Sequence, residues 1–348
     1  MSLVDSRHAS ATAAFLGGLA AALPQDGFWN APVICGVSGG ADSVALLLGL
    51  CRLAPAAATP RLIVAHAHHD LRESADDDSR FVAALAARQG LPFRSQMLAV
   101  REDREGRGEG LEGRARRLRY AFFEDVAREA GARHVVVAHT ADDQAETILH
   151  RALRGTGLAG LAGMAAAREL CEGVALMRPL LRVSREVTRR FLVETNETWR
   201  EDETNRDTKH ARNFLRHEIL PRVEAGHYPA ASASLERLAR QATRSARALA
   251  SAAGHLLDLH AERHPDGRIV MRAAGLGALE PHLVAEMLVV LWKREGWPRR
   301  DMTARHYEQL AEAMINAAHG DGGRSIVELP GGIRAADVGA GLMEFRRA

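Results

Sequence analysis

The chain has few cysteines, and those it has are far apart. Cys35, Cys51 and Cys171 are odd in number and include no Cys-x-x-Cys pair. This pattern argues against a disulfide framework and against a cysteine-rich metal site, and it is typical of proteins of a reducing cytoplasm. We therefore expect a cytoplasmic protein.

Long hydrophobic runs and an excess of charge of one sign are also missing. No segment approaches the roughly 18 apolar residues that a membrane span needs, so we expect no membrane partner. The apolar stretch 9–23 could imitate a signal peptide, but only Arg7 precedes it, and we prefer an amphipathic helix. The formal net charge is only +2, so any nucleic-acid binding must depend on local basic patches.

What the chain does contain is a glycine-rich turn between a strand-like run and a helical run. Ser38-Gly39-Gly40-Ala41-Asp42-Ser43 follows the apolar run 33–37 and precedes the helical run 44–50. A strand, a glycine turn and a helix N-terminus can place backbone N–H groups around phosphate oxygens. The lysine of the common P-loop is missing, and Asp42 beside phosphates would need a divalent cation between them. The alternative is a plain turn in which Asp42 or Ser43 caps the helix.

Strand-like and helical runs alternate from residue 32 to about residue 180. Strands are predicted at 33–37, 61–66, 93–100 and 134–138, and helices at 42–52, 74–89, 111–130 and 140–154. This alternation predicts an α/β fold with a Rossmann-like parallel sheet and helices on both faces. Beyond Pro221 the pattern becomes helical, and Leu329-Pro330-Gly331-Gly332 predicts a hairpin. We therefore expect a catalytic domain at 1–222 and a smaller, mainly helical domain at 223–348 that ends in a β-hairpin.

A second polar segment follows the strand predicted at 134–138, at the sheet edge where ligands bind in such folds. In the run His139-Thr140-Ala141-Asp142-Asp143-Gln144-Ala145-Glu146, Thr140 and Asp143 fit a capping box, which would explain Asp143 structurally. Asp142 and Glu146 stand at i and i+4 with like charge, and such a pair destabilises a helix unless a cation lies nearby. A Mg²⁺ ion or a substrate ammonium group would supply that charge.

Two pairs of arginines and a run of histidines are further candidates. Arg116 with Arg119, and Arg212 with Arg216, each share a helix face and suit phosphate contacts, although salt bridges to nearby acids explain them equally well. The run His66-Ala67-His68-His69-Asp70 invites a zinc-site interpretation, but ligand types without geometry support it only weakly. The backbone of this turn could instead bracket an adenine ring.

Together these motifs resemble those of the tRNA(Ile)-lysidine synthases, a family of N-type ATP pyrophosphatases with a PP-loop. The matching pieces occur in the family's order at 38–43, 69–74, 111–120, 139–158 and 201–216. The resemblance implies that the chain uses ATP and Mg²⁺ and acts on free L-lysine and on tRNA(Ile) with a CAU anticodon. The C2 carbonyl oxygen of the wobble cytidine would attack the α phosphorus of ATP and release pyrophosphate. The lysine ε-amine would then displace AMP to form lysidine. A homodimer is compatible with the sequence.

The resemblance also implies roles for the candidate residues. Catalysis would fall to Asp42, Asp142, Asp143 and Glu146. ATP would be bound by residues 38–43 and His66, with Asp42 and Asp143 near Mg²⁺. Lysine, phosphate or tRNA would be bound by Arg116, Arg119, His139, Arg212 and Arg216.

Other functions stay open at this point. A tRNA thiolase of the same superfamily would use paired cysteines, which the chain lacks. An amidotransferase related to GMP or NAD synthetases would need a glutaminase nucleophile or an ammonia channel, for which no candidate stands out. A non-catalytic, ATP-dependent RNA-binding module would keep the loop but would not need the acids at 142–146. A metal-dependent hydrolase that uses the histidine run is the last alternative.

Overall fold

The computed structural model describes residues 10–56, 61–69, 75–103, 110–201, 211–299, 301–320 and 326–347. Residues 70–74 and 202–210 of the motifs quoted above lie outside these ranges. The chain divides into two compact units, Met1–Arg240 and Gln241–Ala348. The expected division after residue 222 falls inside the first unit, and helix α10 (Ala231–His260) crosses from one unit into the other.

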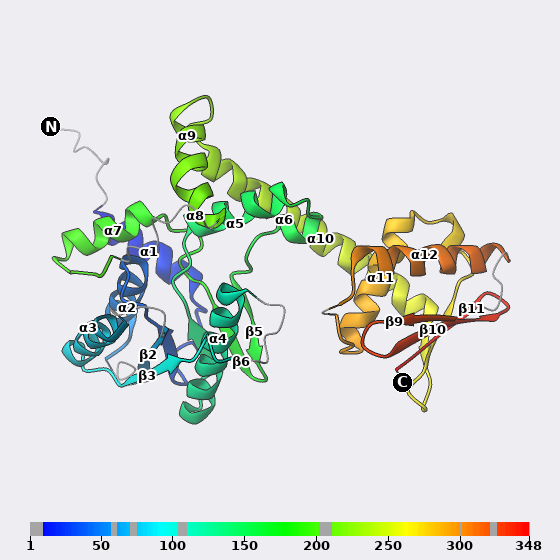
Figure 1. Cartoon of the computed structure of the whole chain (residues 1–348), viewed down its shortest axis with the longest axis horizontal. Coiled ribbons are helices and arrows are strands. Elements are labelled where there is room, and N and C mark those ends of the chain that lie inside the picture. Colours follow the sequence, from blue (N-terminus) through cyan, green and yellow to red (C-terminus); the bar gives the residue numbers. More distant parts are fainter. Residues whose placement is uncertain are drawn as a thin grey trace. The chain divides into compact units, whose positions relative to one another are not determined.

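A sheet of six strands forms the centre of the described part of unit 1 (Figure 1). Its order is β3-β2-β1-β4-β6-β5, and every pair is parallel except β5 with β6. The strands are β1 (Val33–Gly36), β2 (Leu62–His69), β3 (Phe93–Leu98), β4 (His134–Val136), β5 (Ala167–Cys171) and β6 (Val174–Met177). The four predicted strands are confirmed within a few residues. Two strands were not predicted. The edge strand β5 is mostly exposed and shows no alternation of apolar and polar residues, and β6 is a short apolar run that periodicity alone does not distinguish from a helical segment.

Helices cover both faces of this sheet, as the alternation predicts. The helices in the described part of unit 1 are α1 (Ala11–Ala22), α2 (Ala41–Leu53), α3 (Ala75–Arg88), α4 (Leu111–Ala130), α5 (Ala141–Leu153), α6 (Leu158–Leu161), α7 (Arg185–Glu194), α8 (Ala211–Phe214) and α9 (Leu220–Ala225). Of these, α1, α2, α3 and α7 share the core on one face of the sheet, and α4 lies on the other. Successive residues of β1 join different cores. Val33 and Cys35 pack with α1, α2, α3 and α7, whereas Ile34 packs with α4. A strand buried on both faces therefore explains the continuous apolar run.

The strand order reverses beside β1. From β1 the sheet continues through β2 and β3 on one side and through β4 and β6 on the other. Such a switch point separates the loops at the carboxyl ends of two neighbouring strands, and ligands of α/β proteins bind in that crevice. Residues 38–40 follow β1, and residues 139–140 follow β4. The fold therefore brings both polar motifs to the same edge of the sheet.

Unit 2 combines helices with an antiparallel sheet in its described part (Figure 1). The sheet has the order β7-β8-β11-β10-β9. The elements are β7 (Ala261–Arg263), β8 (Ile269–Arg272), α11 (Pro281–Arg294), α12 (Ala304–His319), β9 (Ile326–Leu329), β10 (Ile333–Gly339) and β11 (Leu342–Arg347). Leu329 pairs with Ile333, so the predicted hairpin is confirmed. The sheet is larger than that hairpin because β7 and β8 also pair, on either side of Pro265-Asp266-Gly267, a turn signal not used in the prediction.

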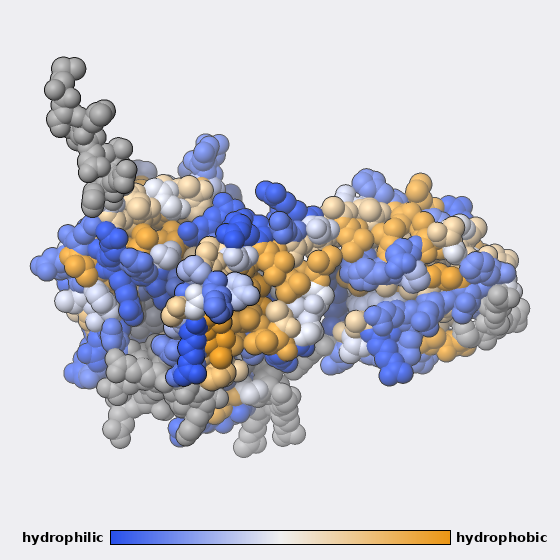
Figure 2. Space-filling model, turned by 90° about the horizontal axis from the view of Figure 1, so that it is seen from above, coloured by the Kyte–Doolittle hydropathy of each residue, from blue (hydrophilic) through white to orange (hydrophobic). Residues whose placement is uncertain are grey.

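The surface combines hydrophilic and hydrophobic areas. On the face seen from above, both kinds of side chain alternate over each unit (Figure 2). Within the described ranges, no helix is at once long enough and apolar enough for a bilayer span. Helix α10 has 30 residues but carries Arg237, Arg240, Arg244 and Arg247.

Close packing of α1 on α2 depends on Gly49. A Cβ atom at this position would lie 2.6 Å from Leu19 Cδ2 and 2.7 Å from Phe15 Cε1, and both side chains are buried. We expect Gly49→Ala to lower the free energy of unfolding by about 1–3 kcal/mol. The control is Gly17→Ala on α1, where an added Cβ meets nothing within 4 Å and should stabilise the helix by roughly 0.5–1 kcal/mol. Urea titrations would measure both variants, and equal effects would contradict this packing.

Candidate functional site

The loop after β1 is held in shape by its own groups. Gly39 has a φ of 94°, a left-handed conformation that favours glycine. The Ser43 hydroxyl accepts a 3.1 Å hydrogen bond from the Ser38 amide and donates a 2.9 Å bond to the Gly40 carbonyl. The Arg200 amide donates a 2.9 Å bond to the Gly39 carbonyl. The loop is therefore fixed by contacts within the protein.

Helix α2 begins at this loop without a side-chain cap. Its N-cap is Gly40, which has no side chain, whereas Ser10, Thr140 and Ser184 cap α1, α5 and α7. The alternative in which Asp42 or Ser43 serves as the cap is therefore not what the structure contains. Uncapped amides at a helix N-terminus, together with the helix dipole, favour an anion. The start of α2 thus has the geometry of a phosphate site.

Helix α5, in contrast, is capped as predicted. Asp143 Oδ2 accepts a 2.8 Å hydrogen bond from the Thr140 amide, and Thr140 Oγ1 accepts a 3.4 Å bond from the Asp143 amide. The capping box fixes the first turn of α5. It thereby sets the positions from which Asp142 and Glu146 extend.

Glu146 and Asp143 are neutralised by arginines from two other segments. Glu146 is only 1% exposed. In the described part of the chain, both acids contact the same three guanidinium groups, and we call these five residues the acid–arginine cluster: Asp143, Glu146, Arg185, Arg212 and Arg216. Glu146 accepts bonds of 2.7 Å from Arg185 Nη1, 3.0 Å from Arg212 Nε and 2.7 Å from Arg216 Nε. The salt-bridge interpretation of Arg212 and Arg216 therefore describes their geometry.

Arg216 lies in a π-helical turn, Leu215–Ile219, that joins α8 to α9. Pro221 follows in the first turn of α9. A proline cannot donate the helical hydrogen bond, and its ring crowds the carbonyl four residues earlier. The wider turn accommodates the proline, and the segment directs both Arg212 and Arg216 toward α5.

The arginines control the ionisation of the two acids. Burial by itself would raise the pKa of Asp143, but Arg185 and Arg212 outweigh burial and lower it to about 2. Burial likewise opposes ionisation of Glu146, yet Arg216 and Arg185 lower its pKa. The pKa of Arg185 is raised by Asp143 and Glu146 against the effect of burial. Asp143, Glu146 and Arg185 are therefore charged at neutral pH.

Arg185 also connects the cluster to the glycine loop. Its amide donates a 2.8 Å hydrogen bond to Asp142 Oδ2, and its Nε lies 3.6 Å from Asp42 Oδ2. Thr188, one turn further along α7, donates a 2.6 Å bond to Asp42 Oδ1. Neither Arg185 nor Thr188 was predicted from the sequence. The available signal was a polar segment that starts at Ser184, directly after the mostly buried run 174–183, as in the two recognised motifs.

Asp42 is the least compensated of these acids. Burial raises its pKa to about 6, although Thr188 and Arg185 oppose the shift. A divalent cation at this carboxylate would reverse the shift. Mg²⁺ is commonly held by one or two carboxylates together with substrate phosphates, so Asp42 fits such an ion. No group of three metal-ligating side chains exists within the described ranges, and the histidine run forms no zinc cage there.

The two candidate histidines are neutral at pH 7. His66 is buried, and its Nδ1 donates a 2.7 Å bond to the carbonyl of Val37, directly before the loop. Burial lowers its pKa, and its Nε2 has no partner among the described residues. Burial lowers the pKa of His139 to about 4, and nearby arginines add to the shift against the influence of Asp143.

Arg116 and Arg119 lie beside Tyr120 on α4. The Arg116 guanidinium carbon is 5.0 Å from the centroid of the Tyr120 ring. Burial lowers the pKa of Arg119, and Arg116 adds to that shift. Arg116 also contributes to the lowered pKa of His139. Positive charge therefore extends from α4 toward the start of α5.

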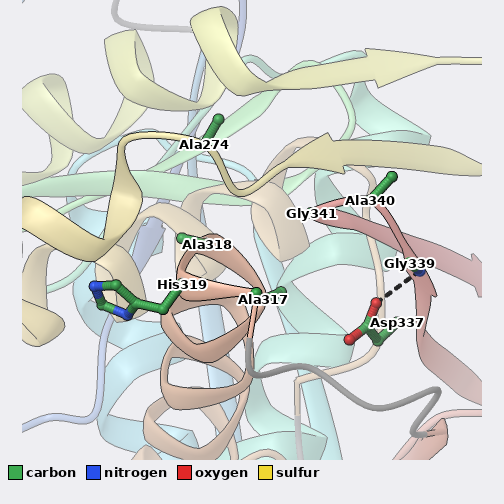
Figure 3. A pocket seen from close by; sticks show the side chains of 9 residues that line it. Ala274, Ala317, Ala318, His319, Asp337, Gly339, Ala340 and Gly341 are labelled. Atoms are coloured by element: carbon green, nitrogen blue, oxygen red, sulfur yellow. Dashed lines mark hydrogen bonds between the residues drawn. The ribbon is translucent and has the colours of Figure 1, made fainter.

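Unit 2 contains a separate cavity of about 420 Å³ (Figure 3). Its lining is mainly alanine and glycine, with His319 and Asp337 as the ionisable side chains. Asp337 Oδ1 accepts a 2.8 Å bond from the Gly339 amide. No arginine or lysine is among the described residues that line this cavity, so it is poorly suited to phosphate.

Comparisons with known proteins show the family to which the chain is related. The PP-loop domain family matches residues 20–223. A tRNA(Ile)-lysidine synthase from Rhodopirellula baltica is 36% identical over 315 residues, which cover 81% of this chain and 79% of that protein. A tRNA(Ile)-lysidine synthase from Thermus thermophilus is 45% identical over 208 residues, 60% of this chain, but the match spans only 38% of that longer relative. Among solved structures, the U34-tRNA thiolase NcsA from Methanococcus maripaludis has a TM-score of 0.54 at 15% identity, over 66% of this chain and 78% of that one. This last likeness supports the fold alone.

Removal of one charge from the acid–arginine cluster should lower the stability of the folded chain. Glu146→Gln leaves three arginines facing Asp143 alone, so we expect the free energy of unfolding to fall by about 3–5 kcal/mol. The matched control is Glu124→Gln on α4, whose partner Arg128 has a side chain that is 63% exposed; its loss should stay below about 1 kcal/mol. Urea titration at neutral pH would measure both, and similar losses would contradict a buried network.

The dependence of stability on pH should reflect the ionised state of Asp143 in the acid–arginine cluster. The pKa of Asp143 is about 2 in the folded chain, below its ordinary value of 3.8. Its stabilising contribution is therefore complete above about pH 4 and is lost as the pH falls through about 2. We expect the stability difference between the unmodified chain and Asp143→Asn to shrink over that interval. A difference for Asp143→Asn that is independent of pH would argue against ionised Asp143 in the cluster.

Proposed function

The chain belongs to the tRNA(Ile)-lysidine synthase family of PP-loop enzymes, and from this premise we propose that it ligates free L-lysine to the wobble cytidine of tRNA(Ile) with a CAU anticodon. The reaction would use ATP and take place in the cytoplasm. One observation carries the proposal: an uncapped glycine loop meets the acids of α5 at the switch point of the sheet, through Arg185. The loop suits a triphosphate, and the acids suit a cationic substrate.

The first step would be adenylation of the cytidine. Its C2 carbonyl oxygen attacks the α phosphorus of ATP, and the bond to pyrophosphate breaks. We assign the departing pyrophosphate to the amides of Gly39, Gly40 and Ala41 and to the start of α2, where charge develops in the transition state. The hydrogen bonds of Ser43 hold these amides in place beforehand. We assign the free Nε2 of His66, an acceptor, to the adenine side of the nucleotide.

Asp42 is the residue that would hold Mg²⁺. When bound, the ion would neutralise phosphate charge and orient the leaving group. Burial without full compensation makes the Asp42 carboxylate receptive to a cation. Asp143, the other expected metal residue, already has both carboxylate oxygens hydrogen-bonded to Thr140 and to arginines. Metal binding at Asp143 would therefore require those arginines to move.

Asp142 is the acid best placed for the ammonium group of lysine. One of its carboxylate oxygens accepts a hydrogen bond from the Arg185 amide, and this carboxylate has no other hydrogen bond or ion pair among the described residues. Asp143 and Glu146 are instead neutralised by arginines. The ammonium must lose a proton before its nitrogen attacks C2, and the Asp142 carboxylate would accept that proton. The bond between C2 and the AMP oxygen then breaks.

The acid–arginine cluster would assist the departure of AMP. Its three arginines and two carboxylates leave one positive charge in excess. Guanidinium groups are well suited to phosphate oxygens. We therefore assign Arg212 and Arg216 to the phosphate of the leaving nucleotide or of the adjacent RNA.

The direct test is incorporation of labelled lysine into an unmodified tRNA(Ile) transcript with a CAU anticodon. We expect incorporation that requires ATP and is accompanied by pyrophosphate release. A transcript with uridine at the wobble position is the control and should stay unlabelled. Orthophosphate as the primary product, or labelling of the control transcript, would overturn the proposed reaction.

Two substitutions should separate the half-reactions. Asp142→Asn should raise the KM for lysine by about 10- to 100-fold through the loss of a charged hydrogen bond, while pyrophosphate release without lysine stays near normal. Asp42→Asn should instead reduce pyrophosphate release. Asp125→Asn on the exposed face of α4 should change neither. A KM for lysine that does not respond to Asp142→Asn would remove Asp142 from the lysine site.

A further inference from the structure

A second group of arginines surrounds Tyr120 on α4. The guanidinium carbons of Arg116 and Arg168 each lie 5.0 Å from the centroid of its ring. Arg178, directly after β6, forms a side-chain hydrogen bond with Tyr120. We call these four residues the Tyr120 cluster. It joins α4 to the two strands at the β5 edge of the sheet.

Arg178 is the unusual member of this cluster. It is only 4% exposed. Its Nη1 donates a 2.8 Å bond to the carbonyl of Ala165, and its Nε has no partner among the described residues. Within the described ranges, no carboxylate forms an ion pair with this guanidinium. A buried cation without a counter-charge is costly, and an anion that reaches it would offset that cost.

The neighbouring arginines likewise have no ion pair with a described acid. Arg168 is exposed, and its Nη1 donates a 2.7 Å bond to the backbone carbonyl of Glu169. Arg116 is exposed as well and has no ion pair with a described acid. Burial lowers the pKa of Arg178, and repulsion from Arg116 and Arg168 adds to the shift. The contrast with the acid–arginine cluster is clear, because there two carboxylates balance most of the charge.

We propose that the Tyr120 cluster binds a backbone phosphate of the RNA substrate. Guanidinium groups match phosphate oxygens in geometry and charge. The Tyr120 ring is already in contact with two of them, so it positions arginines rather than stacking a base. This inference rests on the proposed function for the identity of the RNA.

RNA is favoured over ATP as the source of the phosphate. The triphosphate already has a site in the amides that follow β1, whereas the Tyr120 cluster lies on the β5 side of the sheet. The positive charges of Arg116 and Arg178 both lower the pKa of His139, which lies just before α5. A nucleotide whose base reaches the acids of α5 would therefore carry its neighbouring phosphates toward these arginines.

The salt dependence of RNA binding tests the site. Arg168→Gln removes an exposed cation, so folding should not be affected. With the CAU tRNA(Ile) transcript and fluorescence anisotropy, we expect the Kd to rise about 3- to 10-fold and the slope of log Kd against log salt to fall by about 0.7–0.9, the loss of one phosphate contact. The matched control is Arg94→Gln on β3, where the exposed guanidinium also donates only to a neighbouring carbonyl, that of Phe93, at 3.2 Å. It should bind like the unmodified chain.

The outcomes separate this inference from the proposed function. A slope for Arg168→Gln equal to that of Arg94→Gln would overturn the phosphate site. So would a loss of ATP affinity in Arg168→Gln with RNA binding unchanged, because the phosphate would then belong to ATP. The binding assay contains neither lysine nor ATP. A reduced slope in a chain that forms no lysidine would thus support the site while the proposed reaction fails.

Discussion

The packing of unit 1 around α5 depends on the arginines that neutralise the buried charge of Glu146. A carboxylate with 1% exposure is tolerated only if cations are brought to it. Arg185 comes from the start of α7, and Arg212 and Arg216 come from the segment around the π-helical turn. Two parts of the chain that are distant from α5 in sequence must therefore pack against it. Because Arg185 also reaches Asp42, the loop after β1 cannot be placed independently of this packing.

The same arrangement gives similar side chains different roles. Asp143 and Glu146 are held ionised by arginines, and burial raises the pKa of Asp42 because its partners offset that burial only in part. One carboxylate oxygen of Asp142 has no hydrogen bond to a described residue. The helix ends differ in a parallel way, because α5 is capped by Thr140 whereas α2 begins at a glycine. Environment rather than residue type thus separates a phosphate site from a cation site. On the proposed reaction, the first would receive ATP and the second lysine.

Local signals predict much of this structure. Gly110 and Gly131 bound the helix predicted at 111–130, and α4 occupies that range. Capping chemistry likewise predicts the start of α5, and the apolar strands predict the edge where both polar motifs meet. The partners of those motifs could not be predicted in the same way. Arg185, Thr188 and Arg178 act through contacts across long sequence separations, and a single arginine in a sequence does not indicate whether it will be neutralised or left unpaired.

The most direct measurement is a crystal structure of the chain with a non-hydrolysable ATP analogue and lysine bound. We expect the β and γ phosphates on the amides of residues 39–41, with the lysine ammonium against Asp142 and Arg185 still between α5 and the loop. A triphosphate bound away from Gly39 and Gly40, or a lysine whose ammonium contacts none of the acids of α5, would contradict this arrangement.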